Sequence, residues 1–180
     1  MYSLSKMKKN FIKSHLGFTL VELLVVMAII GILAVISLAN FRTSQIKARD
    51  AERKNDLRQI ANALEAYMSD HGSYPAAVSG RIRACSDVVD CSVLADCQWG
   101  DTPREFCDSN NTVYMKEIPD DVLGSDVAGG QPHYCYFSDG IYFQLYAKLE
   151  NSNDPEAKGP YTCASVGTYN LGIASGNATP

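Results

Sequence analysis

Cysteine is absent from the first 84 residues of this 180-residue chain, and proline is absent from residues 18–74. A stretch without proline can form one uninterrupted helix, because proline is the strongest helix breaker. Acidic residues are absent from residues 1–17, which contain four lysines. These absences divide the chain into a basic start, a region without helix breakers and a remainder that holds every cysteine.

The motifs of several enzyme classes are also missing. The sequence contains no Gly-x-Ser-x-Gly elbow, no Gly-x-Gly-x-x-Gly turn, no P-loop and no His-Glu-x-x-His pair. A nucleophilic cysteine paired with His133 is an alternative, but cysteines in an oxidising compartment are more often disulfide-bonded. We therefore expect that the protein is not an enzyme.

The region from Phe18 to Ala39 is strongly apolar and carries a single acid, Glu22. As a helix, this region would rise about 33 Å, which is enough to cross a bilayer. A secretory signal peptide and a plain membrane anchor are the simplest interpretations. Neither explains Glu22, because a carboxylate in an apolar helix is costly unless it has a partner.

The remainder of the chain is acidic. Residues 75–180 contain 6 Lys and Arg against 14 Asp and Glu. A basic start, an apolar segment and an acidic remainder predict a single pass through the cytoplasmic membrane, with the lysine-rich end in the cytoplasm and the head outside. The negative charge of the head argues against nucleic acid as a partner.

Cleavage of the chain between Gly17 and Phe18 would give Glu22 a partner. The new α-amino group of Phe18 would lie at a helix N-terminus, where a cation is unfavourable with respect to the helix dipole. Glu22 of the same chain, or of a neighbour, can supply the counter-charge. We therefore interpret Glu22 as an assembly residue that sets how far one helix is shifted along the next.

The start of the apolar run matches a known signature. It reads GFTLVELLVV from Gly17, behind a basic leader, and resembles the N-terminus of type IV pilins and type II secretion pseudopilins. The resemblance implies that a prepilin peptidase removes the leader, residues 1–17, and methylates the amino group of Phe18. It also implies that Thr19 and Glu22 act in assembly, with Glu22 bound to the amino group of an adjacent subunit.

After Phe41 the sequence turns polar but keeps a helical period. We expect an apolar segment over 18–41 and an amphipathic continuation over 42–74, with the helix ending near His71 before Gly72 and Pro75. Its charges predict ion pairs within the helix, on solvated faces. Those pairs are Asp50 with Lys54 and Arg53 with Asp56, and the apolar face consists of Leu57, Ile60, Ala61, Leu64 and Met68.

Residues 75–180 predict a small globular head. Apolar residues alternate with more polar ones over 141–150, and Ser138-Asp139-Gly140 supplies a turn back to 134–137. This pattern predicts a β-hairpin near 134–150, and residues 161–173 could add a third strand. The apolar face of this sheet would pack on the helix. The predicted fold class is α+β: a long N-terminal helix, apolar in its first half, packs by its C-terminal half on a small antiparallel sheet, as in the ladle shape of pilins.

All six cysteines lie in the head, and their even number predicts disulfides. A metal site is the weaker interpretation, because there is no Cys-x-x-Cys pair. Six cysteines allow fifteen pairings, of which we expect only that Cys163 lies near Cys135 across the sheet. The six are Cys85, Cys91, Cys97, Cys107, Cys135 and Cys163.

An acidic turn in the head is a candidate calcium site. Asp120, Asp121 and Asp126 surround Gly124, and carboxylate oxygens on a tight loop can bind Ca²⁺. The alternative is an ordinary acidic turn without a metal. We expect no other cofactor.

These features predict a structural subunit of a type IV pilus or pilus-like filament. The subunit would be processed after Gly17 and polymerised by helix bundling into a cell-surface or periplasmic filament. The expected partners are copies of itself or other pilins, a prepilin peptidase, an inner-membrane assembly platform and membrane lipid. One alternative is a type II secretion pseudopilin that binds calcium, and another is a membrane-anchored binding domain that does not polymerise.

Overall fold

The computed structural model describes residues 17–86, 91, 94–100, 105–124, 134–176 and 178–180, without the side chains of residues 36–40. Leader residues 1–16, Asp126 and His133 lie outside the described residues. The chain divides into two compact units, Met1–Arg42 (unit 1) and Thr43–Pro180 (unit 2).

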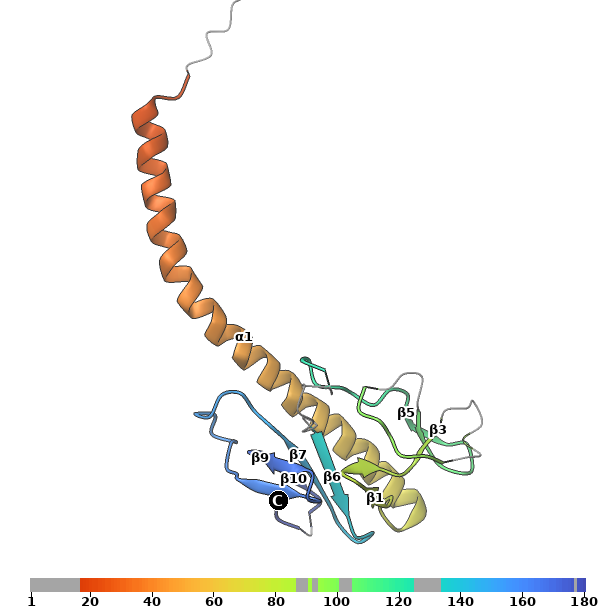
Figure 1. Ribbon diagram of the computed structural model, residues 1–180. Helices are drawn as coiled ribbons and strands as arrows, with labels where there is room; N and C mark the ends of the chain where they lie inside the picture. Colours follow the sequence, from red (N-terminus) through yellow and green to blue (C-terminus); the bar gives the residue numbers. More distant parts are fainter. Residues whose placement is uncertain (1–16, 87–90, 92–93, 101–104, 125–133, 177) are drawn as a thin grey trace, which may run out of the picture. The chain divides into compact units, whose positions relative to one another are not determined.

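One long helix, α1, runs from Leu20 to His71 and contributes to both units (Figure 1). The predicted long helix is therefore confirmed. The helix is terminated by the next residue, Gly72, which has a φ of 71° and donates its N–H to the carbonyl of Met68 at 2.8 Å. A left-handed residue at this position is a common helix terminator, and glycine adopts it without steric cost.

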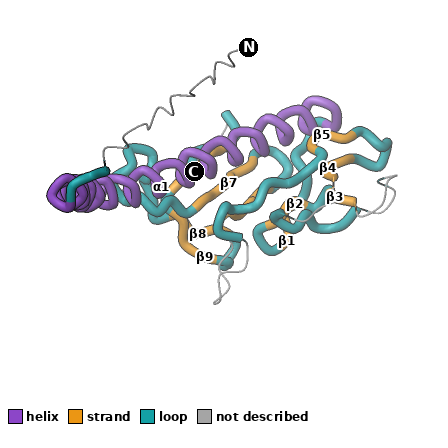
Figure 2. Tube along the Cα trace, turned by 90° about the horizontal axis from the view of Figure 1, so that it is seen from above, coloured by secondary structure: helices purple, strands orange, loops and turns teal. Residues whose placement is uncertain are grey.

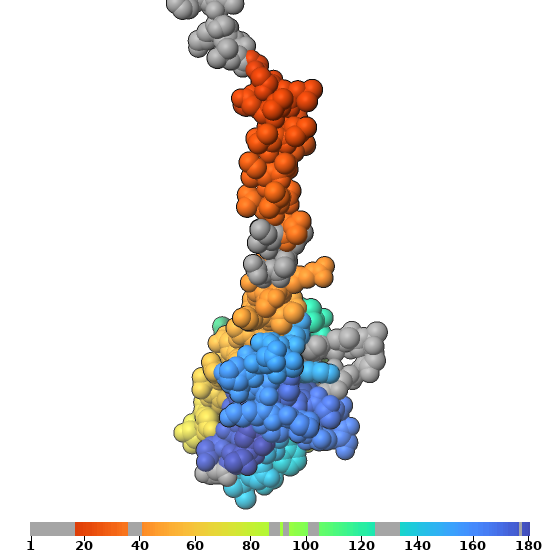
Figure 3. All heavy atoms as spheres, turned by 90° about the vertical axis from the view of Figure 1, so that its left-hand side faces the viewer, coloured from red at the N-terminus to blue at the C-terminus, as the bar shows by residue number. Residues whose placement is uncertain are grey.

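The described residues of unit 1 are the part of α1 up to Arg42 and the short segment before the helix. In Figure 3 those drawn in colour form a column of side chains one helix wide. Apolar side chains are exposed on every side of this column, with exposed fractions of 89% for Phe18, 59% for Leu23 and 64% for Ile32. Within the described residues, no helix is both long enough and apolar enough to cross a membrane.

The described part of unit 2 adds ten short strands in four antiparallel sheets (Figure 2). One three-stranded sheet has the order β10-β7-β6, and a second has the order β3-β4-β5. The strands are β1 (Ala77–Val78), β2 (Arg81–Ile82), β3 (Cys85–Ser86), β4 (Glu105–Cys107), β5 (Val113–Met115), β6 (Tyr134–Ser138), β7 (Phe143–Ala147), β8 (Tyr161–Cys163), β9 (Gly167–Tyr169) and β10 (Leu171–Ala174).

Strands β6 and β7 form a hairpin around Ser138–Gly140, with Tyr134 opposite Ala147. The carboxylate of Asp139 accepts the backbone N–H of Ile141 at 2.9 Å, which stabilises the turn. Strand β10 pairs with the other edge of β7 and is the third strand of the sheet. The expectation of one third strand over 161–173 was too simple, because β8 and β9 pair with each other instead.

The core of unit 2 lies between α1 and the β10-β7-β6 sheet. Leu57, Ile60 and Leu64 of α1 are fully buried, as are Tyr136 of β6 and Leu145 of β7. Burial of each such aliphatic side chain stabilises the fold by about 1.5–3 kcal/mol. The predicted α+β class, with the later half of the helix packed on an antiparallel sheet, is confirmed.

Three disulfides connect the strands and loops of unit 2. They join Cys85 to Cys97, Cys91 to Cys107, and Cys135 of β6 to Cys163 of β8. All six cysteines are therefore paired, and none remains as the thiol nucleophile that the sequence left open.

Candidate functional site

The N-terminal motif, residues 17–22, begins α1 with a capping box. The hydroxyl oxygen of Thr19 accepts the backbone N–H of Glu22 at 3.2 Å. In return, a carboxylate oxygen of Glu22 accepts the backbone N–H of Thr19 at 2.8 Å and its hydroxyl at 2.9 Å. These bonds satisfy amide groups that have no partner at the start of a helix. Thr19 is therefore the N-cap of α1, which explains why the helix starts at Leu20.

The capping box gives Glu22 a role that the sequence interpretation missed. The signal was present, because Thr-x-x-Glu before an apolar run is typical of a helix start. Phe18 directly precedes the cap, so cleavage after Gly17 would create a cationic amino group next to Thr19. Glu22 can then either cap its own helix or form an ion pair with the amino group of a neighbouring subunit.

Gly17 shows no structural need for glycine within the described residues. A Cβ atom built on Gly17 would meet nothing within 4 Å. Close packing therefore does not require glycine here. A requirement for glycine at this position would come from an external partner that binds the segment.

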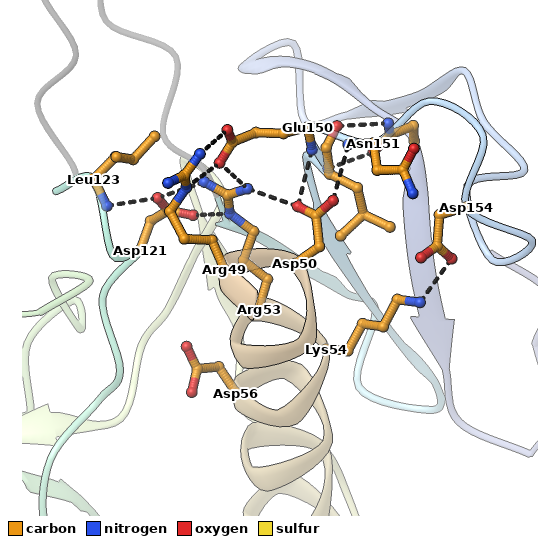
Figure 4. Close-up of polar contacts among 12 residues, drawn as sticks. Arg49, Asp50, Arg53, Lys54, Asp56, Asp121, Leu123, Glu150, Asn151 and Asp154 are labelled. Carbon is orange, nitrogen blue, oxygen red and sulfur yellow. Dashed lines mark hydrogen bonds and ion pairs between the residues drawn. The ribbon is translucent and has the colours of Figure 1, made fainter. Parts of the chain in front are cut away.

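A second candidate site, the Arg53 cluster, lies in unit 2 on the first turns of α1 that pack on the head (Figure 4). Arg53 points from α1 between two loops, one that carries Asp121 and one that carries Glu150. The cluster consists of Arg49, Asp50, Arg53, Asp121 and Glu150.

Arg53 is fully buried, and its guanidinium donates to three carboxylates. Its Nε and Nη2 both bind Asp121, the latter at 2.9 Å. Its Nη1 binds Asp50 and Glu150, each at 2.8 Å. A buried charge is tolerated only when hydrogen bonds and opposite charges replace its hydration, and the planar guanidinium suits such multiple pairing. Burial lowers the pKa of Arg53, but the bonds to Asp121 and the other acids outweigh it, so the pKa is raised.

Carboxylates of the cluster also accept hydrogen bonds from backbone N–H groups. Asp50 accepts the N–H groups of Glu150 at 2.9 Å and Asn151 at 2.8 Å. Asp121 accepts the N–H of Leu123 at 2.9 Å. The cluster therefore attaches two loops, 119–124 and 150–151, to the same part of α1 through charged hydrogen bonds.

Two further charged residues of α1 also pair with groups of the head. Lys54 binds Asp154 at 2.6 Å, and Asp56 accepts the hydroxyl of the buried Tyr134 at 2.7 Å. The predicted ion pairs of Asp50 with Lys54 and of Arg53 with Asp56 were wrong. Arg53 does pair within the helix, but with Asp50. Because these residues face the head rather than solvent, their other partners lie far away in the sequence.

The Arg53 cluster bears directly on the calcium prediction. Both carboxylate oxygens of Asp121 accept hydrogen bonds from Arg53, so a guanidinium holds the place that a cation would need. Asp120 accepts the backbone N–H of Asp121 at 2.8 Å, and Asp126 lies outside the described residues. Among the residues that the structure describes, no group of three or more His, Cys, Asp or Glu side chains is placed so that it could hold a metal ion.

Acid should weaken the head as Glu150 becomes protonated. The hydrogen bond from Arg49, with the help of Arg53, lowers the pKa of Glu150 from its ordinary 4.5 to about 2. A carboxyl with a lowered pKa stabilises the fold above its ordinary pKa and loses this contribution as the pH falls toward 2. Denaturant unfolding at pH 6 and pH 3 should show a larger loss for the wild type than for Glu150→Gln. Equal losses would contradict this role of Glu150.

Comparison with known proteins shows sequence similarity to one family model and to several bacterial proteins. Residues 12–38 match the family model of the prokaryotic N-terminal methylation motif. Type II secretion system core protein G of Pseudomonas aeruginosa is 38% identical over 134 residues, which are 73% of this chain and 80% of that protein. Core protein G of Vibrio cholerae is 28% identical over 165 residues, 92% of this chain and 97% of that protein.

A type IV pilin matches a shorter part. The major pilin PilA of Myxococcus xanthus is 41% identical over 58 residues, which are 32% of this chain and 26% of the pilin. No solved structure gives a significant match.

An apolar helix with a carboxylate in its first turn, followed by an α+β head, defines a pilin-like subunit. The matched methylation motif and the similarity to core protein G over most of the chain agree with this class. The chain belongs to the family of type IV pilins and type II secretion pseudopilins.

Proposed function

We propose that the protein is a filament subunit of the type II secretion pseudopilus, made as a membrane-anchored precursor. The observation that carries this proposal is the apolar surface of α1 in unit 1, where large side chains from Phe18 to Val35 are exposed. A helix that is apolar all round needs an apolar environment. Lipid would provide it before assembly, in a single pass through the cytoplasmic membrane, and helices of neighbouring subunits would provide it in the filament.

The relatives favour the pseudopilus over the pilus. Core protein G of Vibrio cholerae aligns with 92% of this chain, whereas the Myxococcus pilin aligns with 32%. A type IV pilus is the second candidate, because the wide pilus major component PilA4 of Thermus thermophilus aligns over 95% of its own length at 28% identity. Deletion of the gene separates the two: loss of protein secretion with normal surface pili supports the pseudopilus, and loss of pili supports the other candidate.

In the proposed pathway, a prepilin peptidase cleaves after Gly17 and methylates Phe18. An assembly platform in the inner membrane then extracts subunits into the filament. Glu22 leaves its bond with Thr19 or shares it, and binds the amino group of Phe18 on an adjacent subunit. Two opposite charges that meet among apolar helices attract strongly, because the surroundings screen them little.

Substitution of Gly17 by leucine should block processing. Since nothing in the described structure requires glycine at this position, the substitution should spare insertion and folding. A bulky side chain beside the scissile bond should not fit a peptidase that selects glycine. Intact mass spectrometry should find only the precursor, whereas Gly31→Ala, another position where an added Cβ meets nothing within 4 Å, should be cleaved normally. Efficient cleavage of the Gly17→Leu variant would contradict the prediction.

A further inference from the structure

Four cysteines of unit 2 are bonded in an interlaced order. Cys85 bonds to Cys97 and Cys91 bonds to Cys107, so each bond closes a loop that contains one cysteine of the other pair. Cys135 and Cys163 are different, because they are the last two cysteines in the chain and bond to each other.

Loop closure in the unfolded chain favours another pairing. Native bonds join cysteines that are 12 and 16 residues apart. Bonds between sequence neighbours, Cys85 with Cys91 and Cys97 with Cys107, would join residues only 6 and 10 apart. Shorter loops lose less entropy on closure and close faster. In an exported chain the neighbours also meet the oxidant first, since Cys85 and Cys91 emerge before Cys97.

In the folded head the sulfur atoms of these four cysteines are buried. Cys85, Cys91, Cys97 and Cys107 are all 0% exposed. Backbone hydrogen bonds fix their positions, such as those from Cys97 to Ile82 at 2.7 Å and from Cys107 to Ala84 at 2.9 Å. A thiolate needs access to a sulfur atom in order to exchange it. Wrong bonds must therefore be rearranged before this part of the head packs.

We propose that this chain is a substrate of a thiol–disulfide isomerase, which corrects the pairing of these four cysteines before subunits assemble. The inference depends on the disulfides and not on the filament role. The initial bonds are made by a disulfide oxidant, which accepts two electrons and releases two thiols for each bond formed.

The rearrangement balances without further oxidant. The isomerase thiolate attacks Cys85 of the Cys85–Cys91 bond, which gives a mixed disulfide and a Cys91 thiolate. That thiolate attacks Cys107 of the Cys97–Cys107 bond and releases the Cys97 thiolate. Finally, Cys97 attacks Cys85 in the mixed disulfide and regenerates the isomerase thiolate. Two bonds are exchanged, and no electrons are gained or lost.

The test follows the pairing during oxidation of the reduced full-length chain in detergent micelles. Glutathione disulfide is added alone or with a reduced disulfide isomerase, samples are quenched with acid at short times, and the bonds are mapped by mass spectrometry of non-reduced peptides. We expect Cys85–Cys91 and Cys97–Cys107 to dominate with oxidant alone, and the isomerase to increase the native pairs several-fold. Cys135–Cys163 should form equally in both reactions and is the internal control.

A double substitution, Cys85→Ala with Cys97→Ala, is the matched control. The remaining bonds, Cys91–Cys107 and Cys135–Cys163, then join successive cysteines, so their formation should no longer depend on the isomerase. The assay reads covalent pairing and remains informative if this variant folds poorly. Native bonds in the wild type at the same rate with oxidant alone, or an equal stimulation of the variant by the isomerase, would overturn the proposal.

Discussion

Replacing Glu22 with glutamine should abolish filament assembly while the precursor is still inserted and processed. Glutamine keeps a side-chain oxygen that can accept the N–H of Thr19, and it occurs at this position of natural capping boxes. It lacks the negative charge that we propose binds the amino group of Phe18 on the adjacent subunit. The substitution therefore separates the role of Glu22 in the helix start from its role between subunits.

Filaments isolated from disrupted cells and counted by electron microscopy measure assembly, and the mass of the membrane-bound subunit measures processing. Thr19→Ala is the matched control, because it removes the cap but keeps the charge. Loss of an N-cap costs about 1 kcal/mol, which should loosen the first turn and lower the number of filaments without abolishing them. Normal filaments from the Glu22→Gln variant would refute the proposed pairing between subunits.

Replacing Arg53 with methionine should lower the free energy of unfolding of the head by about 3–5 kcal/mol. The variant leaves Asp50 and Asp121 buried without their counter-charge, and the hydrophobic side chain cannot hydrogen-bond to them. Denaturant unfolding of the full chain in micelles measures the loss. The single tryptophan, Trp99, is a suitable fluorescence probe because it is only 5% exposed and lies against Tyr134 with ring centroids 5.8 Å apart.

Arg49→Met is the control for this experiment. The side chain of Arg49 is 25% exposed and binds only Glu150 among the acids of the Arg53 cluster. A partly exposed ion pair typically contributes about 1 kcal/mol or less. If Arg49→Met and Arg53→Met lowered the free energy of unfolding by similar amounts, the result would contradict the claim that the buried Arg53 contributes more to the stability of the head than the partly exposed Arg49.

Local patterns in the sequence predicted the helix and its packing face. The absence of proline over residues 18–74 and the spacing of Leu57, Ile60 and Leu64 depend only on neighbours along the chain. The same pattern also indicated that Arg53 is buried, which the sequence analysis did not predict. Arg53 lies four residues before Leu57, on the buried stripe, where a solvated charge would be out of place.

The partners of Arg53 could not be predicted in the same way. Asp121 and Glu150 lie 68 and 97 residues further along the chain, and only the folded head brings them to α1. The disulfide pairing is also a long-range property, because loop entropy alone favours neighbours while the native bonds are interlaced. The partners of Arg53 and the disulfide pairing both follow from the packing of loops, which cannot be predicted from the periodicity of neighbouring residues.

The mass of the subunit recovered from assembled filaments tests the central claim most directly. The account predicts a chain that begins at Phe18 with a methylated amino group and retains Glu22 at the fifth position of the mature helix. Such a terminus supplies the cation that makes an acid in the apolar run useful. A subunit that begins at Met1, or at a residue beyond Ala39, would contradict the account, because Glu22 would then have no such partner or would itself be lost.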